Sequence, residues 1–145
     1  MAFKFPLATV LRVRTIREER EERMLQQILF EIGQTVRLIE HIDNELSRRN
    51  VRRGTNTFVT VEGNDVHASY GELASLYHHR KEVGVHLEKL EQLRDIQVKA
   101  YETARRDREM LTDMRNDQKD EYAFNMAKRE QTSLDNIFGA RYKRG

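Results

Sequence analysis

The feature that most constrains the fold of this chain is the spacing of its apolar residues, which alternates between three and four positions over long stretches. In the first third of the chain, Thr35 holds one position of this pattern and apolar residues hold the others: Leu25, Ile28, Ile32, Ile39, Ile42 and Leu46. This alternation is typical of the seam along which two α-helices pack as a coiled coil. Upstream, Leu7, Val10 and Leu11 also share one helical face. The spacing therefore predicts a long helix from about residue 5 to about residue 53.

The same register recurs in the second half of the chain. Its apolar positions are Leu73, Leu76, Val83, Leu87, Leu90, Tyr101, Ala104, Leu111 and Tyr122. Polar residues hold further positions of that register: Arg80, Arg94, Gln97, Arg108 and Arg115. Polar residues in a seam lower its stability and fix its register. The pattern predicts a second helix from about residue 67 to about residue 138, followed by a basic tail over residues 139–145.

The segment between these helices, residues 54–66, has the composition of a connecting loop. Gly54 is typical of a helix C-terminal cap, and Ser69 with Glu72 has the spacing of a capping box at the start of the next helix. A short extended piece is expected at 58–61.

Two long helices joined by a loop must fold back on each other, so we expect an all-α fold: two long helices in an antiparallel coiled-coil hairpin. This hairpin would form a single elongated domain over residues 1–145. The second helix is the longer one, so its part from about Met114 onward is expected to lack an intramolecular partner.

The composition agrees with a thin core. Charged residues make up 34% of the chain and hydrophobic residues 38%, which is little apolar material for a compact domain of 145 residues. The net charge of +2 does not favour a protein built mainly to hold nucleic acid. The absence of cysteine excludes disulfides and thiolate zinc sites. We read the chain as soluble and intracellular, since it has no apolar stretch long enough to span a bilayer.

Residues 17–23, REEREER, interrupt the apolar pattern of the first helix with seven consecutive charges. Opposite charges four positions apart contribute only about 0.2–0.5 kcal/mol per pair, too little to replace two apolar layers. One interpretation is a solvated stretch that merely interrupts the seam. The other is a docking surface for a polar partner, since exposed charges set orientation and association rate.

No catalytic, cofactor or metal motif is present in the sequence. It contains no phosphate-binding glycine loop, no zinc-protease helix motif and no nucleophile elbow. His79 and His86 are two helical turns apart, and His78 with Glu82 lacks the further ligands that a metal site needs. We expect a non-enzymatic protein without cofactor or metal.

Both ends of the chain resemble one known family. FKFPLATVLRVRTIREE, residues 3–19, is similar to the opening of the flagellar FliJ family: an aromatic residue, Leu7, Val10, Leu11 and Arg14 before a charged helical run. KREQTSLDNIFGARYKR, residues 128–144, is similar to its close: Arg129, Glu130 and Gln131 before Leu134, Asp135 and a basic end. Pro6 and Gly84 depart from the family pattern, and Gly84 would loosen the second helix.

The resemblance implies a soluble component of the flagellar type III protein export apparatus. Family members form an antiparallel coiled coil similar to the central stalk of rotary ATP synthases. They sit in the pore of the hexameric export ATPase, promote ring assembly and contact the cytoplasmic domain of the export gate protein. They also handle export chaperones. The expected location is cytoplasmic, peripheral to the cytoplasmic face of the inner membrane at the flagellar base.

This reading, by analogy with the rotary stalk, places candidate contact residues on the two helices. The candidate ATPase contacts are Arg17, Arg20, Arg23, Arg105, Arg106 and Arg108. The candidate gate contacts are Leu38, Ile42, Tyr70, Leu73, Leu76 and Tyr77, of which Leu73 and Leu76 are equally well explained as hairpin core.

Two other functions stay open from the sequence. A structural coiled-coil adaptor would self-associate through the long seam. A nucleic-acid-binding coiled coil would bind with an affinity that falls steeply with salt. The chain alone also leaves open whether the secretion system is flagellar or of the virulence type.

Overall fold

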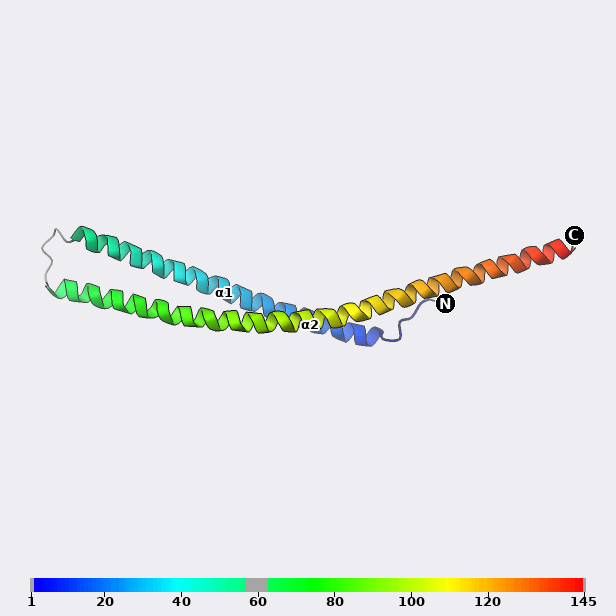
Figure 1. Cartoon of the computed structure of the whole chain (residues 1–145), viewed down its shortest axis with the longest axis horizontal. Coiled ribbons are helices and arrows are strands. Elements are labelled where there is room, and N and C mark those ends of the chain that lie inside the picture. Colours follow the sequence, from blue (N-terminus) through cyan, green and yellow to red (C-terminus); the bar gives the residue numbers. More distant parts are fainter. Residues whose placement is uncertain (1, 57–62, 145) are drawn as a thin grey trace. The chain divides into compact units, whose positions relative to one another are not determined.

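The chain consists of two long α-helices in the computed structural model, which describes the backbone of residues 2–56 and 63–144 (Figure 1). Helix α1 spans Ala8–Asn56 and helix α2 spans Gly63–Arg144. Within the described residues there is no strand, so the all-α prediction is confirmed. The extended piece expected at 58–61 lies outside the described residues.

The helix ends differ from those predicted. Helix α1 continues through Gly54 to Asn56, and α2 already begins at Gly63, so Ser69 lies inside a helix and does not cap one. A glycine within a helix costs only about 1 kcal/mol relative to alanine, and such a cost does not end a helix by itself. The residues of the predicted basic tail continue α2 as far as Arg144.

The N-terminal end also departs from the prediction. Phe5 precedes the helix, and residues 6 and 7 form a turn in which the Ala8 N–H donates to the Phe5 carbonyl oxygen at 3.2 Å. Pro6 has no N–H and a fixed φ, which suits such a turn.

The contacts divide the chain into two compact units where the sequence predicts a single domain. Unit 1 comprises Met1–Glu21 and Tyr101–Gly145, and unit 2 comprises Glu22–Ala100. Each unit combines a stretch of α1 with a stretch of α2. The two are described separately below.

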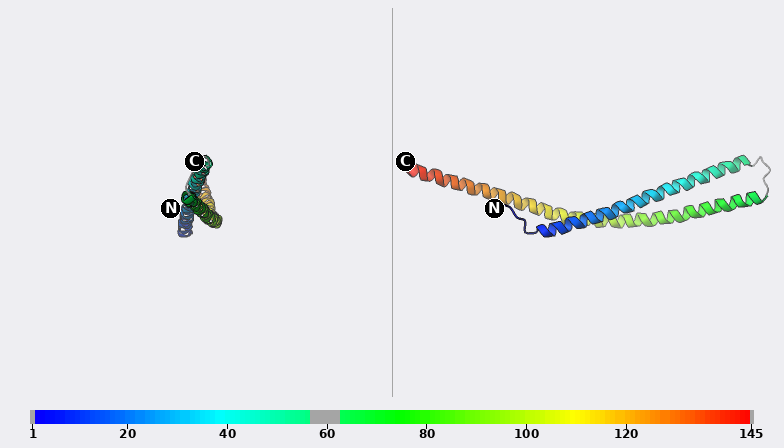
Figure 2. Two further views of the ribbon diagram at one scale, coloured as in Figure 1. Left: turned by 90° about the vertical axis from the view of Figure 1, so that its left-hand side faces the viewer. Right: turned by 180° about the vertical axis from the view of Figure 1, so that it is seen from behind.

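Unit 2 is an antiparallel helical hairpin (Figures 1 and 2). One cluster of its core consists of the buried residues Ile42, Leu46, Leu73 and Val83, with Ile39 and Leu76 packed against them. Two ion pairs connect the helices: Arg80 with Asp43 at 2.5 Å, and Arg49 with Glu72. A higher number on one helix pairs with a lower number on the other, as antiparallel packing requires. Glu72, predicted to cap α2, thus binds a side chain of α1 instead.

The spacing of shielded residues in α1 matches the predicted seam without a break. Every position of the three-and-four alternation from Leu11 to Arg49 is buried or half-buried: 11, 14, 18, 21, 25, 28, 32, 35, 39, 42, 46 and 49. Thr35 is buried in this row and donates its hydroxyl to the Glu31 carbonyl at 2.8 Å, which satisfies it locally. The charged run at 17–23 therefore does not leave the heptad register.

Unit 1 has a small core in which the segment before α1 takes part. Phe5, Leu11 and Leu111 are buried together, and Phe3 packs against them. The ring of Phe3 also lies against Tyr122, with centroids 5.7 Å apart and planes tilted by 48°. These contacts extend along α2 as far as Tyr122. The lengths of the helices had predicted that α2 lacks an intramolecular partner already from about Met114 onward.

The remaining part of α2 in unit 1 is exposed to solvent. Every residue from Ala127 to Lys143 is exposed. The expectation that the distal part of the second helix lacks an intramolecular partner is thus met within the described residues, but over a shorter stretch.

A matched pair of leucines in unit 2 tests the seam. Leu90 is 4% exposed and Leu93 is 51% exposed, three residues apart on α2. Leu90→Ala should lower the free energy of unfolding by about 2–3 kcal/mol, because it removes buried methyl groups and leaves a cavity. Leu93→Ala should change it by less than about 1 kcal/mol. Urea unfolding followed by far-UV circular dichroism measures both, and equal losses would contradict the seam.

Candidate functional site

The charged run of α1 places its residues on different sides of the helix. Arg17 and Arg20, in unit 1, are exposed, and so is Arg23 in unit 2. Glu18 holds a seam position, and its side chain is only 13% exposed. The run thus combines an inward carboxylate with outward guanidinium groups.

Glu18 is bound by Arg108 of α2 within unit 1. The guanidinium donates from Nε to Glu18 Oε2 at 2.5 Å and from Nη2 to Oε1 at 3.2 Å. Such a two-point arrangement fixes the geometry of both side chains and is among the stronger hydrogen-bonded ion pairs. The hydrogen bond to Glu18 raises the pKa of Arg108 above its ordinary value, against a smaller opposing effect of burial. An arginine side chain is charged at any physiological pH even without such a shift.

A second ion pair lies beside the first. Arg14 of α1 and Asp107 of α2 approach to 3.5 Å, with both side chains more than a third exposed. Exposed pairs of this kind contribute little to stability. Together with Glu18 and Arg108, these residues place charged side chains at the seam positions that follow Leu11 on α1, where apolar side chains would otherwise pack.

The predicted ATPase-contact residues on α2 separate into three environments. Arg106 is exposed. Arg105 donates to Glu109 of its own helix at 2.8 Å, and this hydrogen bond raises the pKa of Arg105. Arg108 faces α1, so its assignment to the outward surface is corrected. Its seam position in the sequence already indicated this orientation, because residues of that register point at the partner helix.

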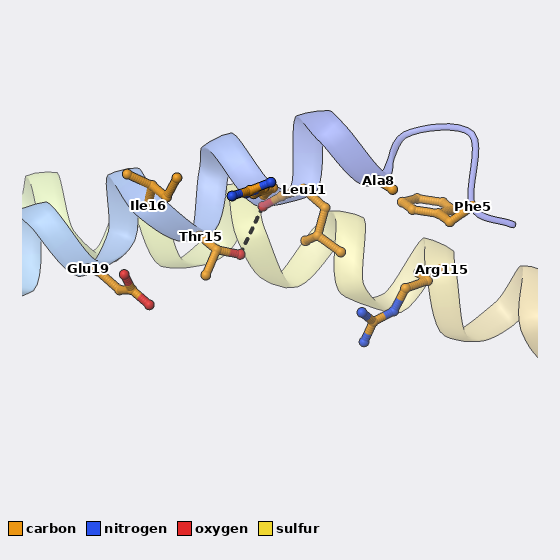
Figure 3. Close-up of a pocket in the computed structure, with 8 residues that line it drawn as sticks. Phe5, Ala8, Leu11, Thr15, Ile16, Glu19 and Arg115 are labelled. Atoms are coloured by element: carbon orange, nitrogen blue, oxygen red, sulfur yellow. Dashed lines mark hydrogen bonds between the residues drawn. The ribbon is translucent and has the colours of Figure 1, made fainter.

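An open apolar hollow lies in unit 1 between the start of α1 and the facing part of α2 (Figure 3). It measures about 340 Å³, and its lining includes Phe5, Leu11, Ile16 and Arg115. Phe5 and Leu11 contribute apolar side chains to its lining, and Glu19 and Arg115 lie at its two ends (Figure 3). The hollow suits an apolar side chain of a partner but contains no group with a catalytic arrangement. The sequence analysis missed it, because Phe5 was assigned to the helix rather than to the segment that folds onto α2.

The predicted gate-contact residues, all in unit 2, divide between core and surface. Ile42 and Leu73 are 3% and 4% exposed and belong to the hairpin core with Leu76. They are not available to a partner, which corrects this part of the prediction: their heptad positions point at the opposite helix. Tyr70 and Tyr77 are about half exposed, and Leu38 is exposed.

In the part of the chain that the structure describes, no group of three or more potential metal ligands converges. His78 lies 3.0 Å from Glu82 on the same helix. None of the described helical stretches has the length and apolar character needed to cross a membrane.

Comparisons with protein-family models, with curated proteins and with solved structures find no match for this chain. A functional assignment therefore depends on the resemblance at the two ends of the chain and on the geometry of its charged and apolar surfaces.

The coupling between Glu18 and Arg108 is measurable by a double-mutant cycle. We expect the single changes Glu18→Ala and Arg108→Ala each to destabilise the protein, and the double variant to lose less than their sum. The difference, about 1 kcal/mol, reports the interaction of two shielded charges. A parallel cycle on Arg105 and Glu109, which are more exposed on one helix, should give a smaller value. Additive losses at Glu18 and Arg108 in urea unfolding would show that the pair does not hold the helices together.

Proposed function

We propose that this chain is a non-enzymatic component of the flagellar type III protein export apparatus and acts as the central stalk of the hexameric export ATPase. The observation that carries the proposal is the arrangement around Glu18 and Arg108. This pair keeps the two helices in register through the charged run while Arg17 and Arg20 stay on the outside. The similarity of residues 3–19 and 128–144 to the flagellar FliJ family supports the assignment to this system.

The proposed mechanism uses the outward arginines as a reversible contact. Exposed cations facing acidic groups of the ATPase ring would orient the stalk and accelerate binding without locking it in place. An interface made of buried apolar side chains would instead bind the stalk tightly, because such side chains slow dissociation. One stalk that contacts several ATPase subunits at once would favour ring assembly through multivalency.

The other proposed partners take different surfaces. The cytoplasmic domain of the export gate protein would contact the exposed residues of unit 2, Leu38, Tyr70 and Tyr77. Amphipathic aromatic side chains of this kind are enriched at protein interfaces. Export chaperones would bind the same chain, which would then act cytoplasmically, peripheral to the inner membrane at the flagellar base.

Two observations speak against the other functions considered. An adaptor that oligomerises through the long seam needs that seam free, yet within each unit the seam of one helix packs against the other helix. A nucleic-acid-binding coiled coil is disfavoured by the net charge of only +2.

The proposal is tested by co-purification with the cognate hexameric export ATPase and by measuring ATP turnover with and without this chain. Wild-type protein should bind and stimulate turnover. Arg17→Glu with Arg20→Glu should weaken binding by about tenfold at low salt, because the contact is electrostatic. The matched control is Arg37→Glu with Lys81→Glu, which reverses two exposed charges in unit 2 and should bind like wild type. Absence of binding by the wild-type chain, or equal binding by both double variants across a salt series, would contradict the proposal.

A further inference from the structure

The seam of α2 ends at Tyr122 although the helix continues. The positions that would extend the same alternation of three and four hold no large apolar residue: Asn125, Arg129, Thr132, Asn136 and Gly139. A helix that paired with α1 beyond this point would bury polar groups without partners, at a cost for each. The distal part of α2 is therefore not built to extend the pairing with α1.

A second stripe of heptad spacing begins where the first one ends. It alternates four, three, four, three and four positions along residues that the structure leaves exposed: Ala123, Ala127, Glu130, Leu134, Ile137 and Arg141. Leu134 is 54% exposed, Ile137 is 50% exposed, and the neighbouring Phe138 is 64% exposed. At about 100° of rotation per residue, this stripe lies on roughly the opposite side of the helix from the positions that would continue the seam.

The two charges within this stripe are placed symmetrically. Glu130 lies four residues before Leu134, and Arg141 lies four residues after Ile137. Neither has an ion pair with another described residue of this chain. An identical helix laid antiparallel, with the two-fold axis between Asp135 and Asn136, would bring Leu134 against Ile137 of the second copy and Glu130 against Arg141 of the second copy.

We propose that a second copy of this chain is the occupant of the exposed stripe, and that the two copies pair antiparallel through residues 130–141 of α2. The pairing is isologous, as a two-fold dimer requires: each contact occurs twice, and both charges in each stripe are neutralised. The paired length is about 17 Å at 1.5 Å per residue, with Phe138 adding apolar area beside the layers of Leu134 and Ile137.

A bilayer surface is a poorer occupant. An amphipathic helix on a membrane buries its apolar face among acyl chains and keeps its charges on the other face. Here Glu130 lies inside the apolar stripe, where a bilayer offers its carboxylate no partner. A second copy offers an arginine at that position. This inference rests on the stripe alone and does not depend on the proposed role in protein export.

Sedimentation velocity over a concentration series tests the pairing. Wild-type protein should show a concentration-dependent shift from monomer to dimer. Glu130→Arg and Arg141→Glu each place like charges opposite each other twice, so each variant alone should dimerise at least about tenfold more weakly. Asp135→Arg reverses a charge outside the stripe and serves as the matched control, with dimerisation close to wild type. Circular dichroism should give the same helix content for all variants.

The decisive sample is an equimolar mixture of the Glu130→Arg and Arg141→Glu variants. In a mixed dimer one chain carries two arginines and the other two glutamates at these positions, so every layer pairs opposite charges and dimer should reappear. The chain that carries both changes should likewise dimerise as the wild type does. A wild-type chain that stays monomeric up to about 100 µM, a range in which even weak specific complexes form, would overturn the proposal. So would single variants that dimerise as well as wild type, or a mixture that stays monomeric.

Discussion

A seam one side chain wide is the constraint on which this structure depends. Two helices that meet only along alternating positions bury few residues per layer, so each layer contributes a large share of the stability of its unit. A polar residue in such a row needs a hydrogen-bond partner. The partner is either a side chain of the facing helix or a carbonyl group of its own helix. Thr35 takes the second route and Glu18 the first. Within unit 1, α2 supplies Arg108 directly opposite Glu18, so this charged position of the row has a partner.

The same pair also explains why charge is retained where leucine would pack well. Replacing a shielded ion pair by apolar residues is often neutral or stabilising, so the pair is not needed for stability as such. Its two hydrogen bonds fix the relative register of the helices in unit 1, which an apolar layer does less strictly. A register fixed in this way holds Arg17 and Arg20 at defined positions on the outer face. The structural role of the inward pair and the proposed role of the outward arginines are therefore two consequences of one seven-residue stretch.

The two helices differ in how completely they are covered, and this difference separates the surfaces available to partners. In unit 2 the apolar seam lies between the helices, and Leu38, Tyr70 and Tyr77 remain at the surface. In unit 1 the short segment before α1 folds onto α2 through Phe3 and Phe5, and beyond Tyr122 the helix stands without cover. A single helix of this length with an apolar stripe is marginal in water by itself. A partner that buries the apolar stripe would stabilise this part of α2. The symmetric placement of Glu130 and Arg141 is what a second copy of the same helix would require.

The amino-acid sequence by itself determined the helical fold, the antiparallel return and the seam, because heptad spacing is a local periodic property that needs no knowledge of neighbours. It identified the seam positions Thr35, Gln97 and Arg108 correctly, and the structure finds the first two buried and the third turned toward α1. The helix ends predicted on both sides of the connection were wrong, since a cap at Gly54 or Ser69 is worth only about 1 kcal/mol and does not decide a helix end by itself. Only the tertiary structure decided that Glu18 binds Arg108 and that Phe5 folds back to form the hollow. Both depend on which residue of the other segment lies opposite. The spacing of residues along one helix does not determine how the second helix is aligned with it along the axis.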